Sequence, residues 1–204
     1  MANHAVQNGA APGRLIYRDL DKNGVIDDND RCIIGNPNPD VSLGLNLAFR
    51  YKALTLDMFF AGDFGQDIIN HMKRQLYSMS YGNLTTNRAR DILNAWTPQN
   101  TGSDIPALSL TDDNNEARFS SYYVENGSYM KMKYLKLSYS FPEKISNAIG
   151  AQGIDVFGQV ENVFTMTKYK GLDPEILPGE YGSLYDGGAY PRPRTFTFGV
   201  NLQF

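Results

Sequence analysis

The sequence predicts an all-β, antiparallel fold, and three observations support this prediction: apolar and polar residues alternate, connections alternate in length, and the composition is aromatic and glycine-rich. The 204 residues include 19 glycines, 13 tyrosines and 11 phenylalanines, which is typical of a turn-rich β protein. This length allows one or two domains with a sizeable core. The single cysteine, Cys32, excludes an intrachain disulfide framework.

The first two predicted strands form a hairpin. In residues 41–51 every odd position is apolar or aromatic and every even position is small or polar, which gives a strand two different faces. The alternation starts again at 54–60, after a connection at 51–53 that is short enough to imply antiparallel pairing.

A long loop separates the hairpin from the third strand. Residues 61–128 lose the alternation, but 87–96 show helical spacing, so we expect a loop that carries one short helix. Alternation resumes over 129–141, where the apolar residues change from even to odd positions. This change predicts a β-bulge near Lys133 and Tyr134.

Two more strands complete the meander, at 154–167 and 195–204, with a long loop at 169–193 between them. Short connections (51–53 and 142–153) therefore alternate strictly with long ones (61–128 and 169–193). Outer-membrane barrels show this asymmetry, and strands of about 9–11 residues suffice to cross a bilayer at a tilt. On pattern alone, a soluble β-sandwich fits equally well.

An acidic segment precedes the first strand. Residues 19–30 follow the spacing D-x-D-x-N-G-x-I-D-x-x-D of an EF-hand-like calcium loop, in which oxygen ligands surround Ca²⁺ and a glycine permits the sharp turn. The last position is Asp instead of the usual bidentate Glu, which should weaken or reshape the site. The candidate ligands for a structural Ca²⁺ are Asp19, Asp21, Asn23, the Val25 carbonyl, Asp27 and Asp30.

Composition and motifs argue against several other functions. The net charge of −3 leaves no basic surplus for nucleic acid, and no run of about 18 apolar residues forms a transmembrane helix. No nucleotide-binding or hydrolase motif occurs, so we expect no enzyme. The best carboxylate candidates for glycoside hydrolysis lie in a polar loop and are interpreted as solvated charges: Asp104, Asp112, Asp113 and Glu116.

With these features in place, the chain resembles the C-terminal part of SusC-like (SusC/RagA) TonB-dependent outer-membrane transporters. The matching segments keep their order and spacing from about residue 14 to the final Phe204. They are 19–30, 34–39 (IGNPNP), 127–142 (GSYMKMKYLKLSYSFP), 161–165 (ENVFT), 169–175 (YKGLDPE) and 191–195 (PRPRT).

The resemblance implies that residues 1–40 are an extracellular loop with the acidic segment and that 41–204 form the last strands of a large transmembrane β-barrel with long extracellular loops. Family members are far longer, so the signal sequence, the plug domain, the TonB-contacting segment and most strands would lie outside this fragment. In such a barrel, unbroken alternation predicts one lipid-facing row on the last strand: Phe196, Phe198, Val200, Leu202 and Phe204.

By the same resemblance, the intact protein imports oligosaccharides or peptides across the outer membrane of a Gram-negative cell. The implied partners are TonB, a SusD-like surface lipoprotein, the barrel assembly machinery and outer-membrane lipid. Loop aromatics could stack on sugars but fit loop packing better, and we assign no ligand residues to Trp96, Tyr181, Tyr185 or Tyr190. The alternative is a secreted, calcium-stabilised β-rich binding or adhesion module.

Overall fold

A computed structural model describes residues 5–82, 86–179 and 182–204 of the chain and divides into two compact units. We call them the sheet unit and the loop unit and describe each by itself. The sheet unit comprises residues 37–67, 126–176 and 189–204. The loop unit comprises residues up to Asn36, 68–125 and 177–188.

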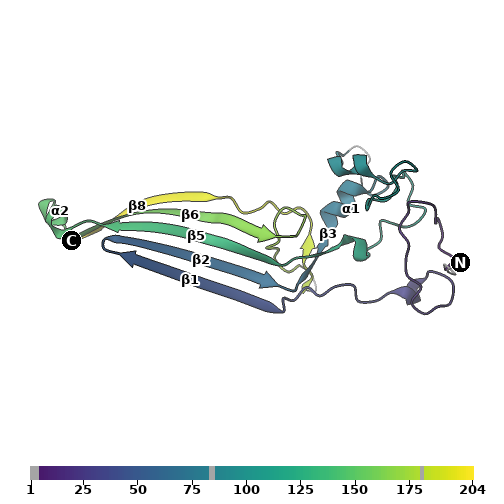
Figure 1. Ribbon diagram of the computed structural model, residues 1–204, viewed down its shortest axis with the longest axis horizontal. Coiled ribbons are helices and arrows are strands. Elements are labelled where there is room, and N and C mark those ends of the chain that lie inside the picture. The colour runs from purple at the N-terminus through teal and green to yellow at the C-terminus, as the bar shows by residue number, and fades with distance from the viewer. Residues whose placement is uncertain (1–4, 83–85, 180–181) are drawn as a thin grey trace. The chain divides into compact units, whose positions relative to one another are not determined.

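The sheet unit is built on one five-stranded antiparallel sheet in the order β1-β2-β5-β6-β8 (Figure 1). All five predicted strands are confirmed. β2 is longer than predicted, because its ladder with β1 continues through the small residues Ala61 and Gly62. The strands are β1 (Val41–Tyr51), β2 (Leu54–Phe64), β5 (Tyr129–Ser140), β6 (Gly153–Thr167) and β8 (Thr195–Gln203).

The predicted β-bulge is present. The register between β2 and β5 shifts between Phe59 and Phe60, and the register between β5 and β6 shifts between Met132 and Tyr134. On β6 the irregularity contains Asn162, whose φ of 52° lies in the left-handed region that Asn tolerates better than most residues. The bulge puts apolar residues before and after Lys133 on the same face of the sheet.

That apolar face runs across all five strands. Directly paired residues in adjacent strands lie on the same face of a sheet, and the register joins apolar residues from strand to strand. One such row is Leu45, Phe60, Met132 and Phe164. Many of these side chains are exposed within the described chain, and Phe198 reaches 81% exposure. The other face is mainly polar.

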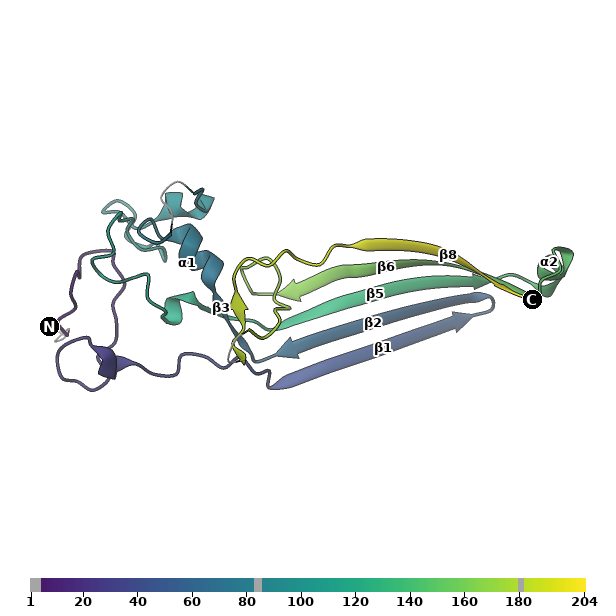
Figure 2. The same cartoon turned by 180° about the vertical axis from the view of Figure 1, so that it is seen from behind.

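Connections of different length leave opposite ends of the sheet (Figure 2). The tight turn between β1 and β2 contains Lys52 with φ 53°, at the end where β8 also finishes. The other connection at this end carries α2 (Glu143–Ala148), which the sequence analysis did not predict. Pro142 at its N-terminus is the available sequence signal, because proline is favoured where a helix begins.

The loop unit contains short elements packed around a small core. Ile68, Tyr123 and Leu184 are almost fully buried there. The predicted loop helix is a 3₁₀-helix, η2 (Arg90–Asn94). The remaining elements were not predicted: η1 (Asp28–Asp30), β3 (Asp67–Asn70), α1 (His71–Tyr77), η3 (Ser121–Tyr123), β4 (Val124–Asn126) and β7 (Tyr185–Asp186), with β4, β3 and β7 forming a small sheet.

Among the described residues, no helix is both long and apolar enough to span a membrane.

Two glycines on the polar face of the sheet provide a matched test of its packing. A Cβ at Gly199 would lie 2.5 Å from the Phe157 ring, whereas a Cβ at Gly44 would lie 3.7 Å from the Phe59 ring, an ordinary contact. We expect Gly199→Ala to destabilise the sheet by about 1–2 kcal/mol, because Phe157 must move. Gly44→Ala should be near neutral. Urea unfolding followed by β-sheet circular dichroism measures both, and equal midpoints would contradict the prediction.

Candidate functional site

The predicted lipid-facing row of β8 belongs to the apolar face of the sheet. Val200 pairs with Val156 and Phe196 pairs with Val160, so this row continues onto β6. All five residues are at least 48% exposed within the described chain. This exposure leaves the row available for lipid, and contact with lipid stays a prediction.

The acidic loop brings three of the six predicted calcium ligands together. One carboxylate oxygen from each of Asp19, Asp21 and Asp30 lies within 4.8 Å of the others. Leu20 and Asp27 donate backbone N–H groups to the two oxygens of Asp30, at 2.7 and 2.9 Å. These hydrogen bonds lower the pKa of Asp30, so its carboxylate stays charged at neutral pH.

The other predicted ligands take part in the turn itself. Asn23 accepts from the Val25 N–H at 2.8 Å and donates to the Asp21 carboxylate at 3.0 Å. Asp27 caps η1 by accepting from the Asn29 N–H and lies outside the three-carboxylate group. Oδ1 of Asp19 is buried and accepts no hydrogen bond from the described residues. A hard cation would satisfy this oxygen, so the donor chemistry fits Ca²⁺.

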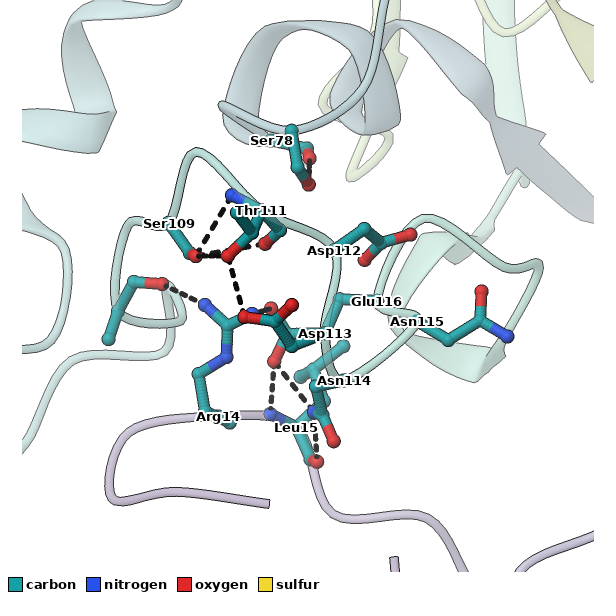
Figure 3. Close-up of polar contacts among 12 residues, drawn as sticks. Arg14, Leu15, Ser78, Ser109, Thr111, Asp112, Asp113, Asn114, Asn115 and Glu116 are labelled. Atoms are coloured by element: carbon teal, nitrogen blue, oxygen red, sulfur yellow. Dashed lines mark hydrogen bonds and ion pairs between the residues drawn. The ribbon is translucent and has the colours of Figure 1, made fainter. Parts of the chain in front are cut away.

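A polar network joins two distant segments of the loop unit (Figure 3). The Glu116 carboxylate accepts from the Leu15 N–H at 2.7 Å and from the Asn114 amide at 2.9 Å, and it forms an ion pair with Arg14 at 3.3 Å. The Asn114 amide also donates to the Leu15 carbonyl at 2.9 Å. The N-terminal segment is thus fastened to the long loop after β2.

This network corrects one sequence interpretation. Glu116 is only 9% exposed and is bound on both oxygens, so it is not the solvated charge that was predicted. The residues next to Glu116 in the sequence gave no sign of this role, because its partner Arg14 lies far away in the sequence. The adjoining cavity of about 20 Å³ has room for roughly one water molecule and is too small for a substrate.

Two of the four loop aromatics, Trp96 and Tyr185, pack against neighbouring residues, as interpreted from the sequence. Trp96 lies against Gly13, and the Tyr185 ring stacks on His71 with centroids 4.8 Å apart. Burial and the nearby Arg74 lower the pKa of His71, which keeps its stacked ring neutral at neutral pH. Tyr190 is 90% exposed, and Tyr181 lies outside the described residues.

A charge cluster around the buried Lys131 lies on the polar face of the sheet. Lys131 on β5 forms ion pairs with Asp173 at 2.6 Å and with Glu175 at 3.0 Å, and Lys133 also pairs with Glu175. The Lys131 side chain is only 4% exposed. Burial alone would raise the pKa of Glu175, but the hydrogen bonds from both lysines outweigh burial and lower it. We call these four residues the loop anchor, because they hold the segment after β6 against the sheet.

The sequence analysis missed the loop anchor. All four residues lie in the two segments 127–142 and 169–175 that carry the resemblance. The sequence analysis used them only to match the family and assigned them no contacts. The available signal was charge: lysines alternate on one strand, and two acidic residues with the same spacing follow on the next long loop. Opposite charges with matched spacing indicate a contact only when the topology brings the two segments together.

No family model matches the chain. Sequence relatives nevertheless cover nearly all of it. TonB-dependent receptor P3 of Formosa agariphila is 36% identical over 200 residues, which is 95% of this chain and 19% of the relative. TonB-dependent receptor SusC of Bacteroides thetaiotaomicron is 30% identical over 200 residues, which is 97% of this chain and 18% of SusC.

Solved structures agree with the sequence relatives. The RagAB peptide importer in its open-open state aligns with a TM-score of 0.69 and 31% identity, over 84% of this chain and 18% of that chain. A second structure of the RagAB peptide transporter gives a TM-score of 0.73 and 28% identity, over 89% of this chain and 19% of that chain. The chain spans about one fifth of the length of the relatives it matches. The resemblance to the SusC-like TonB-dependent receptors is confirmed, and the fold of the chain is that of a segment of their all-β barrel.

Proposed function

We propose that this chain forms part of the barrel wall and outer loops of a TonB-dependent nutrient importer in the outer membrane of a Gram-negative cell. The observation that carries the proposal is the one-sided sheet. Its apolar face crosses five strands without interruption and is exposed, as a wall between lipid and a polar lumen requires. The similarity to SusC and RagAB supports it.

The apolar face then contacts lipid, including Phe196, Phe198, Val200 and Leu202 on β8 and Phe204 directly after it, and the polar face lines the lumen. The long connections at 65–128 and 168–194 lie outside the cell, together with residues 1–40. The tight turn after β1, α2 and the end of β8 lie on the periplasmic side. This topology follows the short-turn and long-loop asymmetry of bacterial barrels.

The imported ligand is an oligosaccharide or a peptide, delivered beneath a SusD-like surface lipoprotein and released inward with energy from TonB. The similar structures are those of a peptide importer, RagAB, which supports the peptide class without excluding saccharides. Barrel assembly machinery would insert the protein. The secreted binding module is not favoured, because the relatives are named as TonB-dependent receptors.

The acidic loop in this proposal holds a structural Ca²⁺ on the outer side. Asp19, Asp21 and Asp30 supply the central carboxylates. Asn23, Asp27 and the Val25 carbonyl would complete the oxygen shell after small rotations. The ion would lock the loop's turn and has no catalytic part.

Arginine substitutions on β8 test which face meets lipid. We expect Val200→Arg to destabilise the full-length protein in bilayers by about 2–4 kcal/mol, because it places a charge in hydrocarbon. Asn201→Arg, the neighbouring residue on the opposite face, should have little effect. A refolding titration into lipid vesicles measures both, and equal losses would contradict the assigned faces.

Cysteine labelling tests the topology. In a Cys32→Ser background of the full-length protein, we expect Thr101→Cys and Ala189→Cys to react with a membrane-impermeant thiol reagent on whole cells. Asn147→Cys in α2 should react only after the outer membrane is permeabilised. All three residues are exposed in the structure, so a cysteine that fails to react on intact cells lies behind the outer membrane and is not buried in the protein. Labelling of Asn147→Cys alone on intact cells would invert the proposed topology.

Calorimetry tests the calcium site. A protein with the intact loop should bind Ca²⁺ with a Kd on the order of 10⁻⁴ to 10⁻³ M, the range of extracellular modules. Asp19→Ala and Asp30→Ala should abolish the binding heat. Asp28→Ala is the matched control, because Asp28 pairs with Arg31 and lies outside the three-carboxylate group. Absence of calcium-dependent heat in the parent protein would refute the site.

A further inference from the structure

A depression of about 390 Å³ lies on the polar face of the sheet unit, next to the loop anchor. Its floor is one row of paired residues across three strands: Tyr134 on β5, Glu161 on β6 and Thr195 on β8. Arg192 and Pro193, just before β8, form one wall. This volume falls within the range of small-molecule sites, so the depression has room for one or two monomer units of a larger ligand.

The backbone around the depression is held in place. The Asn162 amide donates to the Pro193 carbonyl at 2.7 Å. Arg194 donates in the opposite direction, to the Asn162 carbonyl at 3.3 Å and to the Val163 carbonyl at 2.7 Å. The left-handed residue of the β6 irregularity is therefore fastened to the segment that carries Arg192. Such preorganisation lowers the entropic cost of binding.

The charged groups that line the depression differ in whether they already have a partner within the described residues. Lys133 is already paired with Glu175 in the loop anchor. Glu161 accepts a hydrogen bond from the Gln159 amide at 2.8 Å. Arg192 is exposed and forms no ion pair or hydrogen bond within the part of the chain that the structure describes, and in particular none with Glu161. The cavity therefore offers one guanidinium for a ligand.

We propose that this depression is a lumenal subsite for a single organic carboxylate on the imported ligand. The Arg192 guanidinium forms a forked, charge-assisted hydrogen-bond pair with the carboxylate, since its geometry matches that of the group. The Tyr134 ring and Pro193 contact the body of the ligand. Glu161 on the floor repels a second negative charge, which selects a monoanionic segment over a polyanion.

This inference rests on the proposed importer function, because the polar face must line a lumen that ligand enters. Two sources supply the same chemistry: the C-terminus of a peptide and a uronic acid unit of a saccharide. Both are tested as probes with neutral counterparts. The probes are acetyl-triglycine against its amide, and cellobiouronate against cellobiose.

The experiment measures binding of each probe by calorimetry to the purified full-length receptor in detergent. We expect at least one carboxylate probe to bind and its neutral counterpart to bind at least tenfold more weakly, which corresponds to one charge-assisted hydrogen-bond pair. The probe that binds identifies the source. If neither carboxylate probe binds, or if the neutral counterparts bind equally well, the subsite is refuted.

Three variants test the residue assignment. Arg192→Gln should weaken carboxylate binding about tenfold or more. Arg50→Gln, the same change at another exposed position on the polar face, should leave it within about twofold. Glu161→Gln should strengthen it about two- to fivefold by removing repulsion. Equal effects of the two arginine variants, or weaker binding in Glu161→Gln, would overturn the proposal.

Two readouts separate this inference from the importer function. Heat-modified mobility in gel electrophoresis reports the folded barrel, and a loss of the folded form in Arg192→Gln would show that Arg192 is structural and would overturn the subsite. Ligand-dependent growth of cells with the parent receptor tests import itself. Growth with unchanged affinity in Arg192→Gln refutes the subsite alone, whereas absence of growth on any saccharide or peptide refutes the importer function.

Discussion

The antiparallel hydrogen-bond ladder is the constraint on which the sheet unit depends. Each ladder fixes which residues lie opposite one another, and a strand side chain points to the face opposite its neighbours in sequence. The four ladders that join the five strands therefore sort the side chains into two faces of different chemistry. The exposed apolar face, the loop anchor and the proposed subsite are all consequences of this sorting.

The same ladders could be predicted from the sequence because they leave a local pattern. Alternation located all five strands, and the change of phase at Lys133 located the bulge. The loop unit left no such pattern, since its contacts join residues about 100 positions apart, such as Leu15 with Glu116. Its small sheet and α1 depend on those contacts more than on local periodicity.

The candidate sites show the same difference between local patterns, which the sequence predicts, and long-range contacts, which it does not. The acidic loop is a local motif, and the structure does bring Asp19, Asp21 and Asp30 together, although Asp27 serves as a helix cap. Glu116 and the loop anchor were missed or misinterpreted, because charged residues in polar loops look solvated until the topology provides their partners. A sequence can show that a lysine is on the polar face of a sheet without showing which carboxylate it contacts.

The bulge at Lys133 also shows where the gene can change in length. The apolar residues Met130 and Met132 share the face of Leu135 because of the irregularity between Met132 and Tyr134. Deletion of Lys133 alone would join Met132 directly to Tyr134, and simple alternation would then keep both methionines on the face of Leu135. Loss of one residue where the ladder is regular would instead turn the rest of the strand to the opposite face. The bulge is therefore a point on β5 that can lose a residue while the other side chains keep their faces.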